Sequence, residues 1–186
     1  VQFSEHEDPY RAYRRAAESD LRVQAYAWLA HGAVGMTYFS YRTPPRAAVG
    51  PGQQYRSFAE AMIEGETDSV GYGYEIVRPL NIELNFLLRS LVALRPRGVW
   101  YAGDVPPGAD ALRLESDCPV RTIDGPPVIV AAYEDAGGAD WILVVNRRHG
   151  MMRSAQTLAG GVRIHLKDGY GHAIEIDRYS GFDKPI

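Results

Sequence analysis

Two groups of side chains in this sequence have the chemistry of a catalytic or ligand-binding site. The first is an acidic cluster, Glu5-His6-Glu7-Asp8, whose carboxylates and imidazole are candidate metal ligands or acid–base groups. Adjacent residues of an extended chain point to opposite sides, and no second cluster has a recognised ligand spacing, so we expect no metal site. A solvated acidic loop is the alternative interpretation of this cluster.

The second group consists of Tyr38, Tyr41 and Arg42. Aromatic rings can stack on the flat apolar face of a ligand, and a guanidinium group donates several hydrogen bonds. Alternation along an extended segment places Phe39 and Tyr41 on one face and Tyr38 on the other. The same rings could form an ordinary aromatic core, and the sequence leaves both interpretations open.

The composition of the chain narrows its class. Its 186 residues are 46% hydrophobic and 23% charged, which is typical of a globular protein. A net charge of −3 gives no electrostatic reason to expect a nucleic acid partner. Apolar runs such as 128–133 are far shorter than the roughly 20 residues of a bilayer crossing, so we expect no membrane segment. The single Cys118 excludes a disulfide framework within the chain, and no motif indicates a cofactor.

The first half of the chain predicts alternating strands and helices. Residues 1–4 are apolar enough for a buried strand, and Asp20 is a candidate N-cap for a helix that ends at His31-Gly32. Residues 34–41 predict a strand rich in aromatics, and 79–94 predict an amphipathic helix that begins at Pro79. A long loop at 42–55, rich in proline and glycine, separates them.

Beyond residue 96 the pattern changes to short strands separated by turns. Seven candidates lie at 99–103, 111–115, 128–134, 141–146, 154–158, 162–166 and 172–178. Short strands at this spacing predict a small antiparallel β-sandwich. The expected fold class is therefore α/β plus all-β, with an α/β domain at 1–95 and a β-sandwich domain at 96–186.

One segment of the chain resembles a known enzyme family. Residues 21–44 contain Ala30-His31-Gly32-Ala33 followed by the aromatic stretch Tyr38-Phe39-Ser40-Tyr41. They resemble the last crossover of clan A glycoside hydrolases, most closely the β-galactosidase-like (β/α)8 barrels. Leu80-Asn81-Ile82-Glu83-Leu84 is similar to a Leu-Asn-x-Glu-Leu run common in the last barrel helix. The strand-rich tail looks like the small β-sandwich that follows such barrels.

The resemblance implies a partial (β/α)8 barrel made of the last two β/α units. Residues 1–4 would be the seventh strand and 34–41 the eighth. A complete barrel takes about 250 residues, so the first six strands would belong to a missing N-terminal portion of the same protein. The start at Val1, without an initiator methionine, also leads us to expect a cut at this point.

The resemblance also assigns roles to residues. Glycoside hydrolysis requires two carboxyl groups that flank the scissile bond. In these barrels the acid follows the fourth strand and the nucleophile follows the seventh, so Glu5 is the candidate nucleophile. Some relatives place a glutamine on that strand, and Gln2 would fit their pattern. Tyr38, Tyr41 and Arg42, with Gln2, would contact the sugar.

We therefore expect the C-terminal fragment of a glycoside hydrolase-like protein that acts on β-linked glycosides. The fragment should be inactive alone, because the strand that carries the acid is missing. Its expected partners are a carbohydrate substrate and the missing portion of the barrel. Two alternatives stay open: a non-catalytic carbohydrate-binding or assembly module, and a barrel-derived protein that has lost its catalytic residues.

Overall fold

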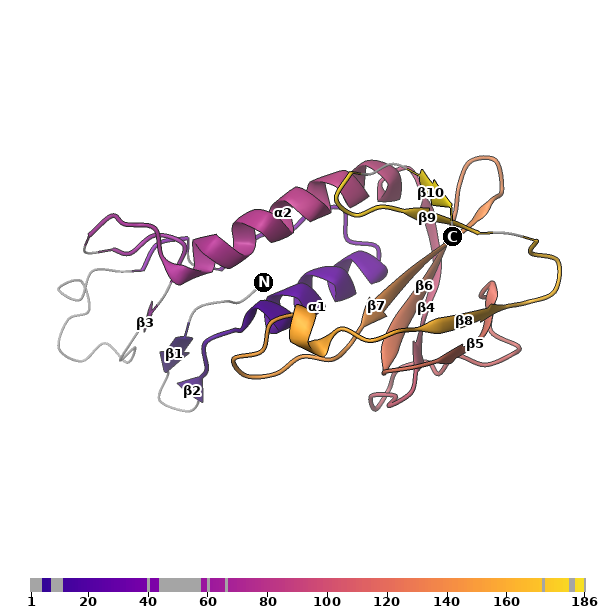
Figure 1. The fold of residues 1–186 in the computed structure, drawn as a ribbon, viewed down its shortest axis with the longest axis horizontal. Helices are drawn as coiled ribbons and strands as arrows, with labels where there is room; N and C mark the ends of the chain where they lie inside the picture. Colours follow the sequence, from indigo (N-terminus) through magenta and orange to yellow (C-terminus); the bar gives the residue numbers. More distant parts are fainter. Residues whose placement is uncertain are drawn as a thin grey trace.

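The computed structural model of the chain describes two helices and a set of small antiparallel sheets (Figure 1). The described residues are 5–7, 12–39, 41–43, 58–59, 61–65, 67–171, 173–180 and 183–185. The predicted strand at 1–4 and most of the predicted loop at 42–55 lie outside them. The described residues thus form a mixed α and β structure.

The elements follow a simple order along the chain. The helices are α1 (Glu18–Ala30) and α2 (Tyr72–Leu91). Short strands β1 (Glu5–Glu7), β2 (Ala12–Tyr13) and β3 (Phe58–Ala59) form one sheet in the order β2-β1-β3. The remaining strands are β4 (Arg95–Ala102), β5 (Val120–Asp124), β6 (Val128–Glu134), β7 (Asp140–Asn146), β8 (Arg163–Leu166), β9 (Ile174–Ile176) and β10 (Asp183–Pro185).

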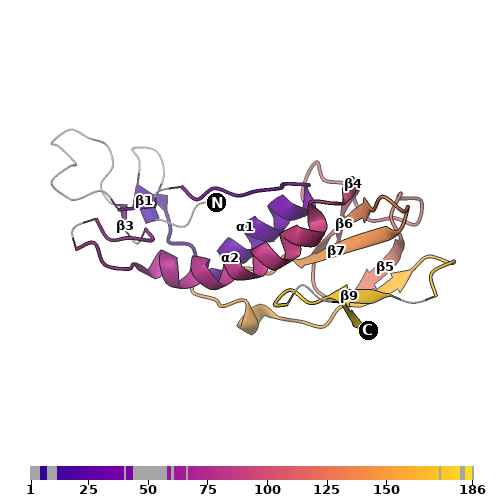
Figure 2. The same cartoon turned by 90° about the horizontal axis from the view of Figure 1, so that it is seen from above.

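The central layer is the three-stranded sheet β4-β6-β7, in which all pairs are antiparallel. Helix α1 packs on one face of this sheet and α2 packs on α1, an arrangement that both ribbon views show (Figures 1 and 2). The two-stranded antiparallel sheet of β5 and β8 contributes Val120 and Leu166 to a cluster on the opposite face. The apolar run of β6 is explained by this position, because its side chains are buried on both faces.

The first helix ends where the sequence predicts and begins earlier. Gly32 adopts a positive φ of 84° just after the helix, the usual conformation of a glycine that terminates a helix. Asp20 is not the N-cap, which is Ala17. Instead, the Asp20 carboxylate accepts a hydrogen bond of 2.8 Å from the Ala17 amide, so it satisfies the free N–H groups from inside the first turn.

The second helix begins seven residues before Pro79, which contradicts the predicted start. Pro79 lies inside the helix, where it cannot donate a hydrogen bond to the preceding turn. Packing explains this extension, because Val77 is buried and Tyr74 and Ile76 contact the same apolar cluster. The N-cap is Gly71, where a Cβ atom would stand 2.3 Å from the Ala61 carbonyl oxygen.

Residues 34–41 do not form the predicted strand. Residues 34–39 run extended beside α1 from its C-terminal end (Figure 2), and an isolated bridge at Phe39 is the only strand-like assignment among the described residues of 34–41. A strand exists only when a neighbour completes its ladder, and no described segment lies along 34–38 in that way. The segment therefore has the backbone shape of a strand without a sheet.

The second half differs from the predicted strand pattern in four places, one of which is the unpredicted strand β10. Ala111 makes a single bridge to Tyr101 and turns follow it, so 111–115 is not a strand. Residues 154–158 are not a strand either, because they contain a short 3-10 helix, Gln156–Leu158, in which Thr157 donates hydrogen bonds to the Ser154 hydroxyl and carbonyl. Strand β5 was not predicted, since its alternation of buried and exposed residues is interrupted by a register shift at its start.

Candidate functional site

Tyr38 lies on the face of the extended segment that meets α2. Its hydroxyl donates a hydrogen bond of 2.5 Å to Oδ1 of Asn81, and its ring packs against the apolar cluster between the two helices. Burial raises the pKa of the Tyr38 hydroxyl, which keeps it a proton donor at neutral pH. This residue therefore holds the extended segment on α2.

Phe39 and Tyr41 lie on the opposite, open face of the same segment. Their side chains are 57% and 63% exposed. The backbone carbonyl of Tyr41 accepts a hydrogen bond of 3.1 Å from the Ile63 amide, so its position is fixed although its ring is exposed. An exposed ring on a fixed backbone is well suited to stack on a ligand.

Arg42 is held by the turn that precedes α2. Its guanidinium donates to the Gly65 carbonyl at 2.9 Å and pairs with the Asp68 carboxylate at 2.6 Å. Both side chains of this ion pair are at least half exposed. The contact orients Arg42 beside Tyr41 at the end of the extended segment and leaves it within reach of solvent.

The predicted nucleophile lies in a neighbouring part of this region. Glu5 opens strand β1 and pairs in antiparallel register with Ala59 of β3. A few residues later Ile63 pairs with Arg42. Ala59 and Ile63 are four residues apart along the chain, so the backbones of Glu5 and Arg42 both pair with nearby residues of the same part of the chain. Gln2 lies outside the described residues.

A buried carboxylate on α2 joins both helices, and neither it nor its partners were among the predicted site residues. Glu83 is only 3% exposed and accepts two hydrogen bonds from Arg22, at 2.7 and 2.8 Å. The Tyr26 hydroxyl donates a third at 3.0 Å, and Arg178 approaches to 3.9 Å. The signal available in the sequence was the four-residue spacing of Arg22 and Tyr26, which places both on one face of α1.

The electrostatics of Glu83 identify it as a structural anion. Burial alone would raise the pKa of this carboxyl, but the hydrogen bonds and charge of Arg22 outweigh it and lower the pKa below its usual value. Burial, followed by the neighbouring carboxylate, raises the pKa of Tyr26. A carboxylate kept ionised by a bidentate arginine cannot serve as a proton-donating acid, so this group connects helices instead.

A second buried carboxylate, Asp20, joins α1 to the loop after β7. Arg14 binds it at 2.6 and 2.8 Å and Nδ1 of His149 lies at 2.9 Å, in addition to the Ala17 amide. Burial would raise its pKa, but the hydrogen bonds from Arg14, Ala17 and His149 together lower the pKa to about 2. This carboxylate therefore has a structural role as well, because it connects the start of α1 to the loop after β7.

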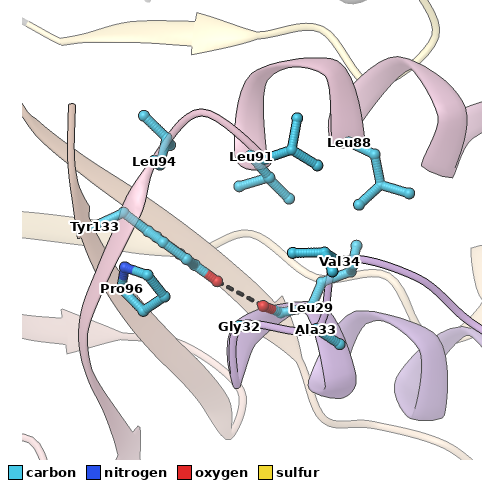
Figure 3. Close-up of a pocket in the computed structure, with 10 residues that line it drawn as sticks. Leu29, Gly32, Ala33, Val34, Leu88, Leu91, Leu94, Pro96 and Tyr133 are labelled. Carbon is cyan, nitrogen blue, oxygen red and sulfur yellow. Dashed lines mark hydrogen bonds between the residues drawn. The ribbon is translucent and has the colours of Figure 1, made fainter. Parts of the chain in front are cut away.

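A small apolar pocket lies where the C-terminal ends of α1 and α2 meet β4 and β6 (Figure 3). Its volume is about 60 Å³, and leucines including Leu88 and Leu91 line it. Its one side-chain hydroxyl, from Tyr133, already donates to the Leu29 carbonyl at 2.6 Å (Figure 3). This pocket is too small and too apolar for a sugar, although an apolar side chain would fit it.

The described residues contain no group of three His, Cys, Asp or Glu side chains that could hold a metal ion. No helix in the described part of the chain has the length and apolar character of a bilayer crossing. No protein-family model matches the chain, and no curated protein or solved structure is significantly similar to it.

Proposed function

We propose that this chain is the C-terminal part of a glycoside hydrolase-like protein that acts on β-linked glycosides. In this proposal the stretch from β1 to α2 supplies the last two β/α units of a (β/α)8 barrel. A preceding part of the same protein supplies the other strands and the catalytic acid. The chain by itself therefore has no hydrolase activity.

The observation that carries the proposal is the extended segment between α1 and α2. Its inner face is held on α2 by Tyr38, whereas Val34, Phe39 and Tyr41 are 74%, 57% and 63% exposed. Large apolar side chains exposed together indicate a surface that a partner covers. A helix, an extended segment with one open side and a second helix, in this order, are what the end of a barrel would look like before its neighbouring strands are added.

The polar contacts that α2 makes with the extended segment and with α1 support the same proposal. The Leu-Asn-x-Glu-Leu run places Asn81 on Tyr38 and Glu83 on Arg22. Both polar residues of the run therefore position the segments that the proposal assigns to the barrel. Leu80 and Leu84, the outer leucines of the run, are buried in the cluster between the helices.

The β-rich half supports an accessory β-sandwich. The sheet β4-β6-β7 and the two-stranded sheet β5-β8 share an apolar cluster formed by Cys118, Val120, Val128, Val130 and Ala132. Two antiparallel layers that bury one common face are the basis of a sandwich. In the proposal this half stabilises the barrel from the outside, because its other face packs on α1.

The proposed site roles follow from position. Glu5 would be the nucleophile, Tyr41 would stack on the sugar, and Arg42 would donate to its hydroxyls. Gln2 and Tyr38 complete the set that would contact or position the substrate.

An assay of the chain with and without the missing part tests the proposal. The purified chain should not hydrolyse p-nitrophenyl β-galactoside, whereas the product of a reading frame extended upstream of the Val1 codon should do so. In the extended protein, Tyr41→Ala should raise KM and Phe39→Ala serves as its neighbouring control. An extended, folded product without activity on any p-nitrophenyl β-glycoside would refute the proposal.

A further inference from the structure

A polar cleft at one end of the central sheet lies outside the region to which the glycosidase proposal assigns substrate. Its volume is about 540 Å³, and it is a shallow cleft that is largely open to solvent. The lining is almost entirely charged and polar, unlike that of most small-molecule sites. The lining residues are Arg95, Pro96, Arg97, Asp117, Glu134, Gly138 and Asp140.

The sheet places three of these residues in one row. Arg95 of β4 is opposite Glu134 of β6, and Glu134 is opposite Asp140 of β7. The Arg95 guanidinium donates to Glu134 at 2.8 Å and remains 74% exposed. The row therefore presents a guanidinium followed by two carboxylates across one end of the sheet.

A β-bulge directs Arg97 into the same cleft. The register of β4 shifts between Pro96 and Gly98, which leaves Arg97 outside the regular ladder. Its guanidinium contacts both Asp140 and Asp117. A Cβ atom at Gly98 would stand 2.5 Å from the Trp100 ring, so a larger residue beside the bulge would displace that ring. Bulges of this kind re-aim a side chain and are common next to functional sites.

Rigid neighbours surround the row. The Asp135 side chain accepts hydrogen bonds from the Gly137 and Ala139 amides at 2.8 and 2.9 Å, which fixes the turn between β6 and β7. The Tyr170 hydroxyl donates to Asp140, and the Tyr170 side chain is 41% exposed. An exposed ring whose polar end is anchored at the cleft offers a surface for stacking.

The charges in the cleft select the chemistry of a ligand. Two guanidinium groups donate hydrogen bonds only, and three carboxylates accept only. A sugar hydroxyl does both, so neighbouring hydroxyls can bridge a carboxylate and a guanidinium. The surplus of one negative charge disfavours phosphate or another anion. The side chains already bind one another, so little conformational entropy is lost when a ligand binds.

We propose that this cleft binds a neutral sugar, with Arg97 and Asp140 as its central hydrogen-bonding pair and Tyr170 as its stacking surface. The site is separate from the proposed barrel site and requires no part of the protein beyond the described residues. It would hold a carbohydrate chain without cleaving it.

Titration of the labelled chain with lactose, followed through its amide NMR shifts, tests this proposal. The shifts should be confined to Arg95, Arg97, Asp117, Glu134, Asp140 and Tyr170, with a Kd on the order of 1 mM. Arg97→Lys keeps the positive charge but loses the planar guanidinium group, which can donate hydrogen bonds to two partners at once. This variant should weaken lactose binding at least about tenfold. Arg121→Lys is the matched control, because Arg121 pairs with the exposed Asp168 outside the cleft and its variant should bind lactose unchanged.

The absence of shifts in the cleft would overturn the proposal. An unchanged Kd in a folded Arg97→Lys variant, or equal shifts with inorganic phosphate, would do the same. Shifts confined to Tyr41 and its neighbours would also overturn it, while agreeing with the glycosidase proposal. Failure of hydrolysis in the extended protein would leave the lactose titration unaffected, so the two proposals fail separately.

Discussion

At the scale of single residues, the two buried carboxylates have the largest predicted energetic effects. Glu83→Gln would remove the negative charge that Arg22 faces across the helix pair, where both side chains are largely buried. Breaking one partner of a buried pair costs about 3–5 kcal/mol, and the lower end applies because Glu18 also contacts Arg22. Urea unfolding should report this loss.

A matched substitution separates burial from charge. Asp168→Asn removes the carboxylate that pairs with Arg121, but Asp168 is 98% exposed, so the change should cost less than about 1 kcal/mol. Equal losses in the two variants would mean that Glu83 is not buried as described.

Asp20 predicts a specific pH dependence. Its pKa is about 2 in the folded chain and about 4 when unfolded, so its contribution to stability is complete above the unfolded value. That contribution, about 2 kcal/mol, should be lost as the pH falls from about 5 towards 2. Urea midpoints measured across this range should fall less in Asp20→Asn than in the wild type. Parallel pH profiles would contradict the assignment.

At the scale of elements, α2 depends on one apolar face. Leu80 is fully buried between the helices, so Leu80→Ala should destabilise the chain by about 2–5 kcal/mol. Ile82→Ala, two residues away on the exposed face, should change stability by less than about 1 kcal/mol. Thermal unfolding of both variants measures the difference. A larger effect at Ile82 would mean that α2 buries the face of Ile82 and exposes the face of Leu80.

Local pattern was sufficient to predict some elements and insufficient for others. The apolar run of β6 was predicted with its exact bounds, 128–134, because a strand buried on both faces leaves an unbroken signal. The start of α2 was wrong, because Pro79 is favoured in a first turn and only tertiary packing extends the helix past it. Residues 34–41 have strand composition, but a strand also needs a neighbour, which composition cannot supply.

The same limit applies to the candidate site. Aromatic content and alternation identified Tyr38, Phe39 and Tyr41 as two opposed faces of one segment. The partner of Tyr38 is 43 residues away along the chain, and the partner of Arg22 is 61 residues away. Pairings over such distances depend on how the helices pack, so spacing within a motif does not reveal them.

At the scale of the whole molecule, α1 belongs to two cores at once. Leu21 and Leu29 pack towards α2, whereas Ala30 packs with Ile129 and Tyr133 of the sheet. We therefore predict that helix and sheet unfold in one transition. In a Trp28→Phe variant, which removes the tryptophan of α1 and leaves Trp100 and Trp141 of the sheet, helical circular dichroism and tryptophan fluorescence should give the same urea midpoint. Two separate midpoints would indicate that the halves fold independently.

The most direct test of the central claim is turnover of p-nitrophenyl β-galactoside by the product of the upstream-extended reading frame, wild type against Glu5→Gln. The account predicts hydrolysis by the wild type, none by Glu5→Gln, and none by the 186-residue chain alone. Activity in the 186-residue chain itself, or a folded extended product that hydrolyses no β-glycoside, would contradict the account. Activity retained by Glu5→Gln would remove Glu5 as the nucleophile.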